Sequence, residues 1–131
     1  MIAIDASALI AILDEEDDAE CYANCIAEAD SPLISAASLL EVGIVMVSRH
    51  GRKAQRKIDA LVQEADIQVE RFTAQHAQLA LEAYTKYGKG QKHPAGLNYG
   101  DCFSYALAKA TGLPLLFKGN HFSRTDLTSA L

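Results

Sequence analysis

The chain has few of the features that mark a secreted, zinc-binding or nucleic-acid-coating protein. Its 131 residues carry 12 basic and 17 acidic side chains, and a net charge of −5 argues against a surface that binds nucleic acid all over. Three cysteines, an odd number, suit a reducing compartment and are expected to be small buried apolar residues. Four scattered histidines provide no closed zinc set.

The sequence also lacks a long hydrophobic run and a basic N-terminal segment. The longest uncharged apolar stretches, residues 6–13 and 42–47, are far too short to cross a bilayer. Asp5 interrupts the first apolar stretch, so no signal peptide is expected. We therefore expect a cytoplasmic protein without a membrane segment. With no repeat or linker, residues 1–131 are expected to form one domain.

Short apolar stretches alternate with helical patterns along the whole chain. Strands are predicted at residues 2–4, 33–35, 67–72 and 113–117. Helices are predicted at residues 7–13, 15–29, 36–49, 53–65, 74–87 and 101–110. This order predicts a central parallel sheet covered on both faces, which is a three-layer α/β/α sandwich.

Three acids occupy positions where a lone charge needs a reason. Asp5 ends the first strand, Glu41 interrupts an apolar helix, and Asp101 opens another helix after Tyr99 and Gly100. Ligands bind at the carboxyl ends of strands in open parallel sheets, so the three carboxylates are expected to converge there. Such a cup suits Mg²⁺ or Mn²⁺, which can activate water and offset charge on a phosphodiester.

Each acid also has a simpler interpretation. Asp5 is in position to cap the helix that follows it. Asp101 fits an ordinary acid in the first turn of a helix. Glu41 would have to pair with a base or face solvent, because a buried unpaired carboxylate costs several kcal/mol or changes its pKa.

Four segments carry a resemblance to a known family. The chain resembles the PIN-domain ribonucleases, and specifically the VapC-type toxins of type II toxin–antitoxin pairs. The resemblance runs nearly end to end and is anchored in residues 4–9, 35–41, 98–103 and 115–122. The first three segments place the family's acids on Asp5, Glu41 and Asp101, and the family's small hydroxyl residue on Ser7.

The resemblance implies a metal-dependent endoribonuclease that acts as a growth-arresting toxin on a structured RNA such as tRNA. Asp5, Glu41 and Asp101 would be catalytic and would hold Mg²⁺ or Mn²⁺, with Ser7 orienting a carboxylate or a water. It also implies a homodimer and a small VapB-type antitoxin that occludes the site, often with a basic side chain near the acids.

The chain departs from the family pattern at one point. Many PIN domains carry a fourth acid just after the last core strand, whereas this chain has Gly119, Asn120 and His121 there. Asp126, a few residues later, is a candidate replacement, although aspartate is also common in surface turns. The departure puts a second metal ion in doubt.

Basic residues gather beside the expected site despite the acidic total. Lys89 and Lys92 lie in the loop before Asp101, and Lys118 and Arg124 follow the last strand. We expect these four side chains to hold RNA phosphates, since phosphate contacts supply salt-dependent affinity. The simpler interpretation is that they are solvated surface residues.

Three other classes of protein stay open. A phosphatase-like enzyme with a nucleophilic Asp5 usually has a second acid two positions on, where this chain has Ser7. A phosphoacceptor domain needs its acceptor at a strand end, whereas Asp59 lies in an amphipathic helix. A catalytically weak PIN-like module that acts only by binding a protein partner is compatible with the missing fourth acid.

Overall fold

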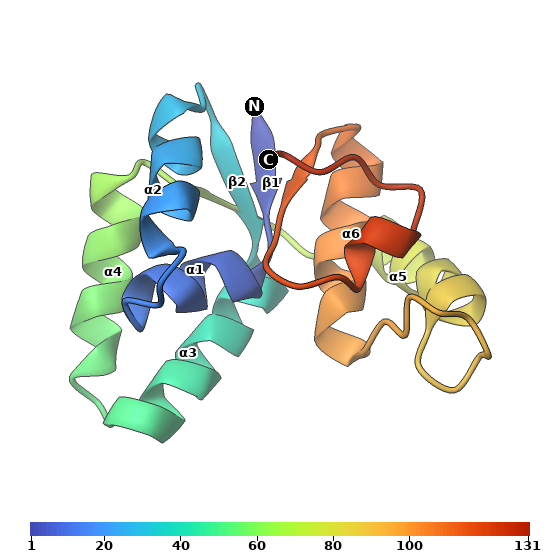
Figure 1. The fold of residues 1–131 in the computed structure, drawn as a ribbon, viewed down its shortest axis with the longest axis horizontal. Helices are drawn as coiled ribbons and strands as arrows, with labels where there is room; N and C mark the ends of the chain where they lie inside the picture. Colours follow the sequence, from blue (N-terminus) through green and yellow to red (C-terminus); the bar gives the residue numbers. More distant parts are fainter.

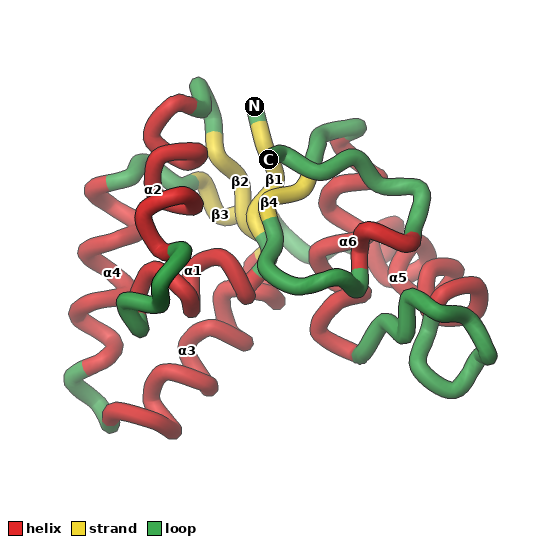
Figure 2. The backbone as a smooth tube through the Cα atoms, in the orientation of Figure 1, coloured by secondary structure: helices red, strands yellow, loops and turns green.

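A central parallel sheet separates two groups of helices in the computed structural model, which describes residues 1–131 (Figure 1). The four strands lie in the order β3-β2-β1-β4, and every neighbouring pair is parallel. Figure 2 shows the strands in the middle, with α1 to α4 on one side and α5 and α6 on the other. The predicted three-layer α/β/α sandwich is confirmed. The strands are β1 (Ile2–Ile4), β2 (Pro32–Ser35), β3 (Gln68–Glu70) and β4 (Leu115–Leu116).

The two faces of the sheet are covered because alternate strand residues point to opposite sides. Ile4 and Ile34 join the core cluster under α1 to α4, while Ala3 and Leu33 join the cluster under α5 and α6. Burial on both faces explains why β1 and β4 contain only apolar residues and why β2 does not alternate, although it ends in the buried Ser35.

The helices begin and end largely where the sequence signals them. Thr73 Oγ1 accepts a hydrogen bond from His76 N at 3.2 Å, so Thr73 caps α5. Gly51 ends α3 with φ 78°, and Gly112 ends α6 in the left-handed conformation with φ 70°. None of the helices combines the length and apolarity that crossing a bilayer requires. The helices are α1 (Ala6–Leu13), α2 (Ala19–Glu28), α3 (Ala36–His50), α4 (Ala54–Glu64), α5 (Ala74–Tyr87), α6 (Tyr99–Thr111) and the short 3₁₀ helix η1 (Phe122–Arg124).

Three local expectations were wrong. The helix predicted at residues 15–29 begins only at Ala19, because its acidic residues 15–18 form the turn before α2, where Glu15 has a positive φ of 51° that a helix does not allow. The third and fourth strands are shorter than predicted, because only residues 68–70 and 115–116 pair in the sheet. Among the cysteines, only Cys102 is buried, while Cys25 is half-buried and Cys21 is exposed.

Candidate active site

The carboxyl ends of the strands place Asp5 at one edge of the sheet. Asp5 directly follows β1, and its backbone N–H donates to Leu116 O of β4 at 2.9 Å. Its ψ of 154° keeps it extended while α1 begins at the next residue, so the side chain turns back over the start of that helix. Asp5 is only 4% exposed, so its carboxylate is withdrawn from water.

Serine hydroxyls hold the buried Asp5 carboxylate. Ser7 donates to Asp5 Oδ2 from its Oγ at 2.6 Å and from its backbone N at 3.0 Å, and Ser104 Oγ donates to Oδ1 at 2.5 Å. Ser38 Oγ lies 3.1 Å from Ser104 Oγ and must be the donor, because the Ser104 proton goes to Asp5. Burial raises the pKa of Asp5 above its ordinary value, and these hydrogen bonds oppose the increase.

Ser7 also ties the site to the chain after β4. Its Oγ accepts a hydrogen bond from Lys118 N at 2.9 Å while it donates to Asp5. The Lys118 ammonium turns away to Glu16 and to Asp18, which it contacts at 3.1 Å. The role predicted for Ser7, orienting a carboxylate, therefore has a direct geometric basis.

Asp101 is positioned by the cap of α6. Asn98 Oδ1 accepts from Asp101 N at 2.8 Å, and Asp101 Oδ2 accepts from Asn98 N at 3.0 Å, which is a complete capping box. The same Oδ2 lies 2.8 Å from His121 Nδ1. Asp5 therefore caps α1 and Asp101 is an acid in the first turn of α6, as in their simpler interpretations, and neither role prevents the side chain from facing a pocket.

Glu41 projects from the second turn of α3 against the start of α6. A Cβ added to Gly100 would lie 2.3 Å from Glu41 Oε2, so only glycine leaves room for this carboxylate. Burial, together with repulsion from Asp5 and Asp101, raises the pKa of Glu41 from 4.5 to about 7, and no neighbour lowers it.

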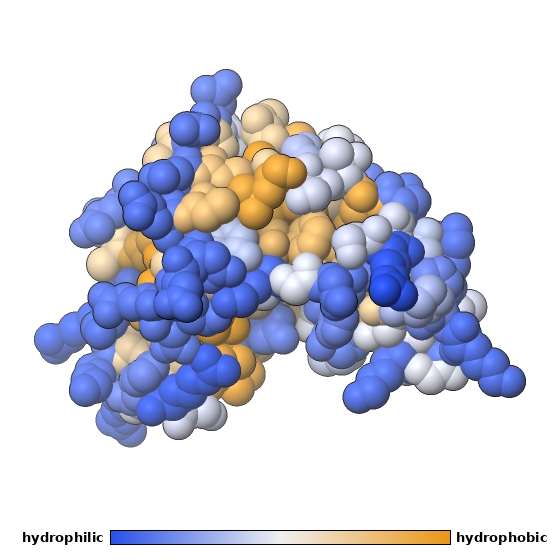
Figure 3. Space-filling view, viewed as in Figure 1, coloured by the Kyte–Doolittle hydropathy of each residue, from blue (hydrophilic) through white to orange (hydrophobic).

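The predicted acids share one pocket of about 220 Å³. It opens at the strand ends, and the space-filling view shows the lower edge of the molecule indented between the two groups of helices (Figure 3). Of the predicted site residues, Asp5, Ser7, Glu41, Asp101 and Lys118 line the pocket. The others do not: Asp126 binds Tyr105 Oη at 2.7 Å and Lys109 Nζ at 2.5 Å, and Lys89, Lys92 and Arg124 lie outside.

The carboxylates of the pocket are ligands that suit a divalent cation, but their side chains are not already arranged around one position. No three His, Cys, Asp or Glu side chains are close enough to form a ready-made metal-binding group. Asp5 is turned toward its serines, and Asp101 toward Asn98 and His121. Yet burial and repulsion from Asp5 and Asp101 raise the pKa of Glu41, and Glu41 itself has no basic partner. A bound cation would supply the missing positive charge.

Sequence reasoning did not predict the contacts that three residues make in this site. Ser104 lies three positions after Asp101, so helical spacing places both on one face of α6. Asn98 and Asp101 have the spacing of a capping box. His121 lies in the segment after β4 where many PIN domains carry a fourth acid, and its contact with Asp101 required the fold to be known.

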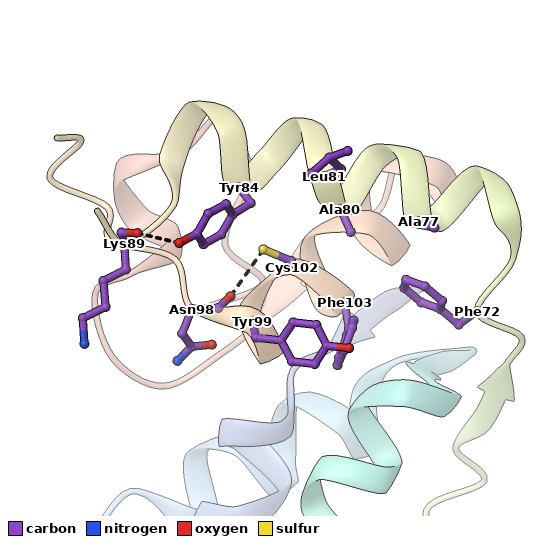
Figure 4. Close-up of a pocket in the computed structure, with 10 residues that line it drawn as sticks. All are labelled: Phe72, Ala77, Ala80, Leu81, Tyr84, Lys89, Asn98, Tyr99, Cys102 and Phe103. Carbon is purple, nitrogen blue, oxygen red and sulfur yellow. Dashed lines mark hydrogen bonds between the residues drawn. The ribbon is translucent and has the colours of Figure 1, made fainter. Parts of the chain in front are cut away.

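A second, apolar depression lies beside the carboxylate pocket (Figure 4). This α5/α6 groove has a volume of about 630 Å³ and is lined mainly by side chains of the two helices and by Phe72. Asn98 lines both the groove and the carboxylate pocket. Ala77, Leu81 and Tyr84 of α5 line this groove, and Leu81 is an exposed hydrophobic side chain.

Sequence comparisons agree with this geometry. The pattern of the PIN domain matches residues 2–127. The chain is 51% identical to Ribonuclease VapC28 of Mycobacterium tuberculosis over 128 residues, which cover 98% of this chain and 96% of that protein. The chain belongs to the VapC ribonucleases of the PIN-domain family. Ribonuclease VapC of Mycolicibacterium smegmatis is 48% identical over 126 residues, covering 96% of this PIN domain and 97% of that one.

Among solved structures, this PIN domain is similar to VapC20 of Mycobacterium tuberculosis, described as a toxin that cleaves the sarcin–ricin loop. The TM-score is 0.79 at 19% identity, and the match covers 98% of this chain and 97% of that one. The likeness supports the three-layer fold.

Replacing Glu41 with glutamine is expected to stabilise the ion-free protein more at pH 8 than at pH 5. The pKa of Glu41 is about 7 in the folded protein and 4.5 ordinarily, so the folded state binds more protons between these values. Stability is therefore lost as pH rises through this window, and Glu41→Gln removes the loss. Thermal unfolding at both pH values tests this, with exposed Glu82→Gln as control. An equal shift at both pH values would contradict it.

Gly100→Ala is expected to abolish RNA cleavage while the protein stays folded. The new methyl group would displace the mobile end of Glu41 rather than backbone, so the strain is relieved at the site. Gly43→Ala on α3 is the matched control, because its Cβ would meet nothing within 4 Å. That change should stabilise α3 by about 0.5–1 kcal/mol. Circular dichroism, melting temperature and cleavage rate separate the two variants; equal cleavage would show that the Glu41 position is unimportant.

Proposed function

We propose that the protein is a metal-dependent endoribonuclease, the toxin of a type II toxin–antitoxin pair, that cleaves a structured RNA such as tRNA in the cytoplasm. The observation that carries the proposal is the meeting of Asp5, Glu41 and Asp101 in one pocket at the strand ends. Family membership supports the ribonuclease activity, and the acids supply a place for the ion.

Some residues of the pocket would hold the metal ion, and others would orient the carboxylates that hold it. Asp5, Glu41 and Asp101 would hold Mg²⁺ or Mn²⁺, which supplies charge neutralisation at the cleaved phosphodiester and a more acidic water when bound. Ser7 and Ser104 fix the two oxygens of Asp5, which limits its rotation. Asn98 does the same for Asp101 through the capping box. Prior fixing of these groups reduces the reorganisation needed at reaction.

Chelator-treated, partner-free protein is expected to cleave a small-RNA pool only after Mn²⁺ or Mg²⁺ is restored. Asp5→Asn and Asp101→Asn should each lower the restored rate by on the order of a hundredfold or more. Asp59→Asn, on exposed α4, is the matched control and should cleave normally. Gel analysis of the products measures all four proteins.

Two results would contradict this proposal. Cleavage that persists without metal, or in both Asn variants, would place the chemistry elsewhere. No cleavage by the folded wild type with metal present would favour the second candidate, a PIN-like module that acts only by binding a protein partner.

Basic residues near the pocket are proposed to hold RNA phosphates. Lys89, Lys92 and Arg124 are exposed, whereas the Lys118 ammonium is already paired with Glu16 and Asp18. Lys118 would therefore have to leave these acids to meet a phosphate. The free residues are the stronger candidates.

Charge reversal at Lys89 and Lys92 is expected to weaken RNA binding and flatten its dependence on salt. Each lost phosphate contact should reduce, by roughly 0.7, the slope of the logarithm of the RNA-binding constant against the logarithm of the salt concentration. Binding is measured by fluorescence anisotropy in chelator, so that the RNA stays intact. The same charge change at Arg56 and Lys57, exposed on α4, is the control. Equal slopes for both double variants would reject the proposed RNA contact.

A VapB-type antitoxin is the proposed protein partner. The acids that repel one another in the pocket would attract a basic side chain of such a partner, which would occlude the site. Inhibition of cleavage by the antitoxin, lost when that basic side chain is replaced, is the test of this contact.

A homodimer is the proposed assembly. Leu40, Ile44 and Val47 are exposed on α3, where Figure 3 shows hydrophobic surface, and the α5/α6 groove carries exposed Leu81 and Tyr99. Two such surfaces would exclude water if copies packed together. Sedimentation of the partner-free protein decides it: a single species of 14.1 kDa would rule the dimer out.

A further inference from the structure

His121 lies in the segment after the last strand, where the resemblance to PIN domains implies a fourth acid that this chain lacks. It follows β4 by a few residues, and Gly119, with φ 98°, turns the chain so that His121 returns to the start of α6. Its side chain is 50% exposed and lines the carboxylate pocket. The pocket therefore contains an imidazole beside its three carboxylates.

The three other histidines have different surroundings. His50 binds Asp14 at 2.7 Å, and His93 accepts from Ala95 N at 3.0 Å. His76 is buried on α5, with its Nδ1 unpaired. None of the three lines the carboxylate pocket, so His121 is the one imidazole available to an ion there.

The spacing of His121 and Asp101 matches two ligands of one ion. His121 Nδ1 lies 2.8 Å from Asp101 Oδ2. Adjacent ligands at about 2.1 Å from an octahedral ion are about 3 Å apart. An ion can replace this hydrogen bond when Nδ1 carries no proton and the single ring proton of the neutral imidazole is on Nε2. Because the ring is half exposed, it has room for this small adjustment.

The chemistry of the donor set then changes the choice of ion. A carboxylate brings a negative charge and a hard oxygen, both of which favour Mg²⁺. An imidazole is neutral and softer, and its nitrogen favours first-row transition metals. Exchange of an acid for His121 therefore weakens the pocket for Mg²⁺ and preserves its affinity for ions that accept nitrogen ligands.

We propose that His121 supplies an imidazole ligand to the ion held by Asp5, Glu41 and Asp101, and that this donor set prefers Mn²⁺ to Mg²⁺. The proposal rests on the metal dependence of the proposed function. It assigns His121 a role that the proposed function leaves open, and it provides a fourth ligand without the missing acid.

Ion binding tests the proposal without relying on cleavage. Tag-free, chelator-treated wild type, His121→Ala, His121→Asp and the control His50→Ala are titrated with Mn²⁺ and Mg²⁺ by calorimetry. Pulsed electron paramagnetic resonance of the Mn²⁺-loaded proteins reports nitrogen bound to the metal. Melting temperatures of the ion-free proteins confirm that each variant is folded.

The wild type and His50→Ala should show ¹⁴N coupling to Mn²⁺ and a preference for Mn²⁺ over Mg²⁺. His121→Ala should lose the coupling and on the order of tenfold in Mn²⁺ affinity. His121→Asp should lose the coupling but bind Mg²⁺ more tightly. The ratio of Mn²⁺ affinity to Mg²⁺ affinity should therefore fall by a similar factor.

The possible failures are distinguishable. Mn²⁺ binding without ¹⁴N coupling in the wild type, or an unchanged ion preference in His121→Asp, overturns the ligand role and leaves the metal-dependent function intact. His121 would then only position Asp101. Absence of binding of either ion to the folded wild type overturns both proposals.

Discussion

The buried carboxylate of Asp5 is the constraint on which the rest of the site depends. Withdrawal of this acid from water is unfavourable, and the fold offsets the cost with hydroxyl donors from α1 and α6. Because Ser104 on α6 in turn binds Ser38 on α3, one charged group connects helices from both sides of the sheet. The hydrogen bonds that offset the cost of burying the Asp5 carboxylate also fix the direction of its two oxygens.

Stability and site geometry are therefore supplied by the same atoms. Asp101 completes a helix cap while facing the pocket, and Glu41 is admitted by the absence of a side chain at Gly100. The three acids come from segments far apart in the chain and meet because parallel strands end at one edge. Their mutual repulsion is the part of the arrangement that the protein alone does not balance.

Much of this could be predicted from the sequence because the signals are local. The apolar strands, the helical segments and the sheet with helices on both faces follow from periodicity and from the order of the elements. The meeting of Asp5, Glu41 and Asp101 followed from topology and from the family resemblance. Contacts between distant segments were not accessible, because no local pattern records that Ser104 reaches Asp5 or that Asp126 turns to Lys109.

Asp101 both caps α6 and faces the pocket, so substitutions of the three acids would have different effects on stability. Replacement of Glu41 removes its repulsion with Asp5 and Asp101, so a variant without activity can be as stable as the wild type. A replacement at Asp101 removes an oxygen that caps α6 and binds His121, so loss of activity there also weakens the fold. An inactive but folded descendant of this protein would therefore arise with a smaller loss of stability through substitution of Glu41 on α3 than of Asp101 on α6.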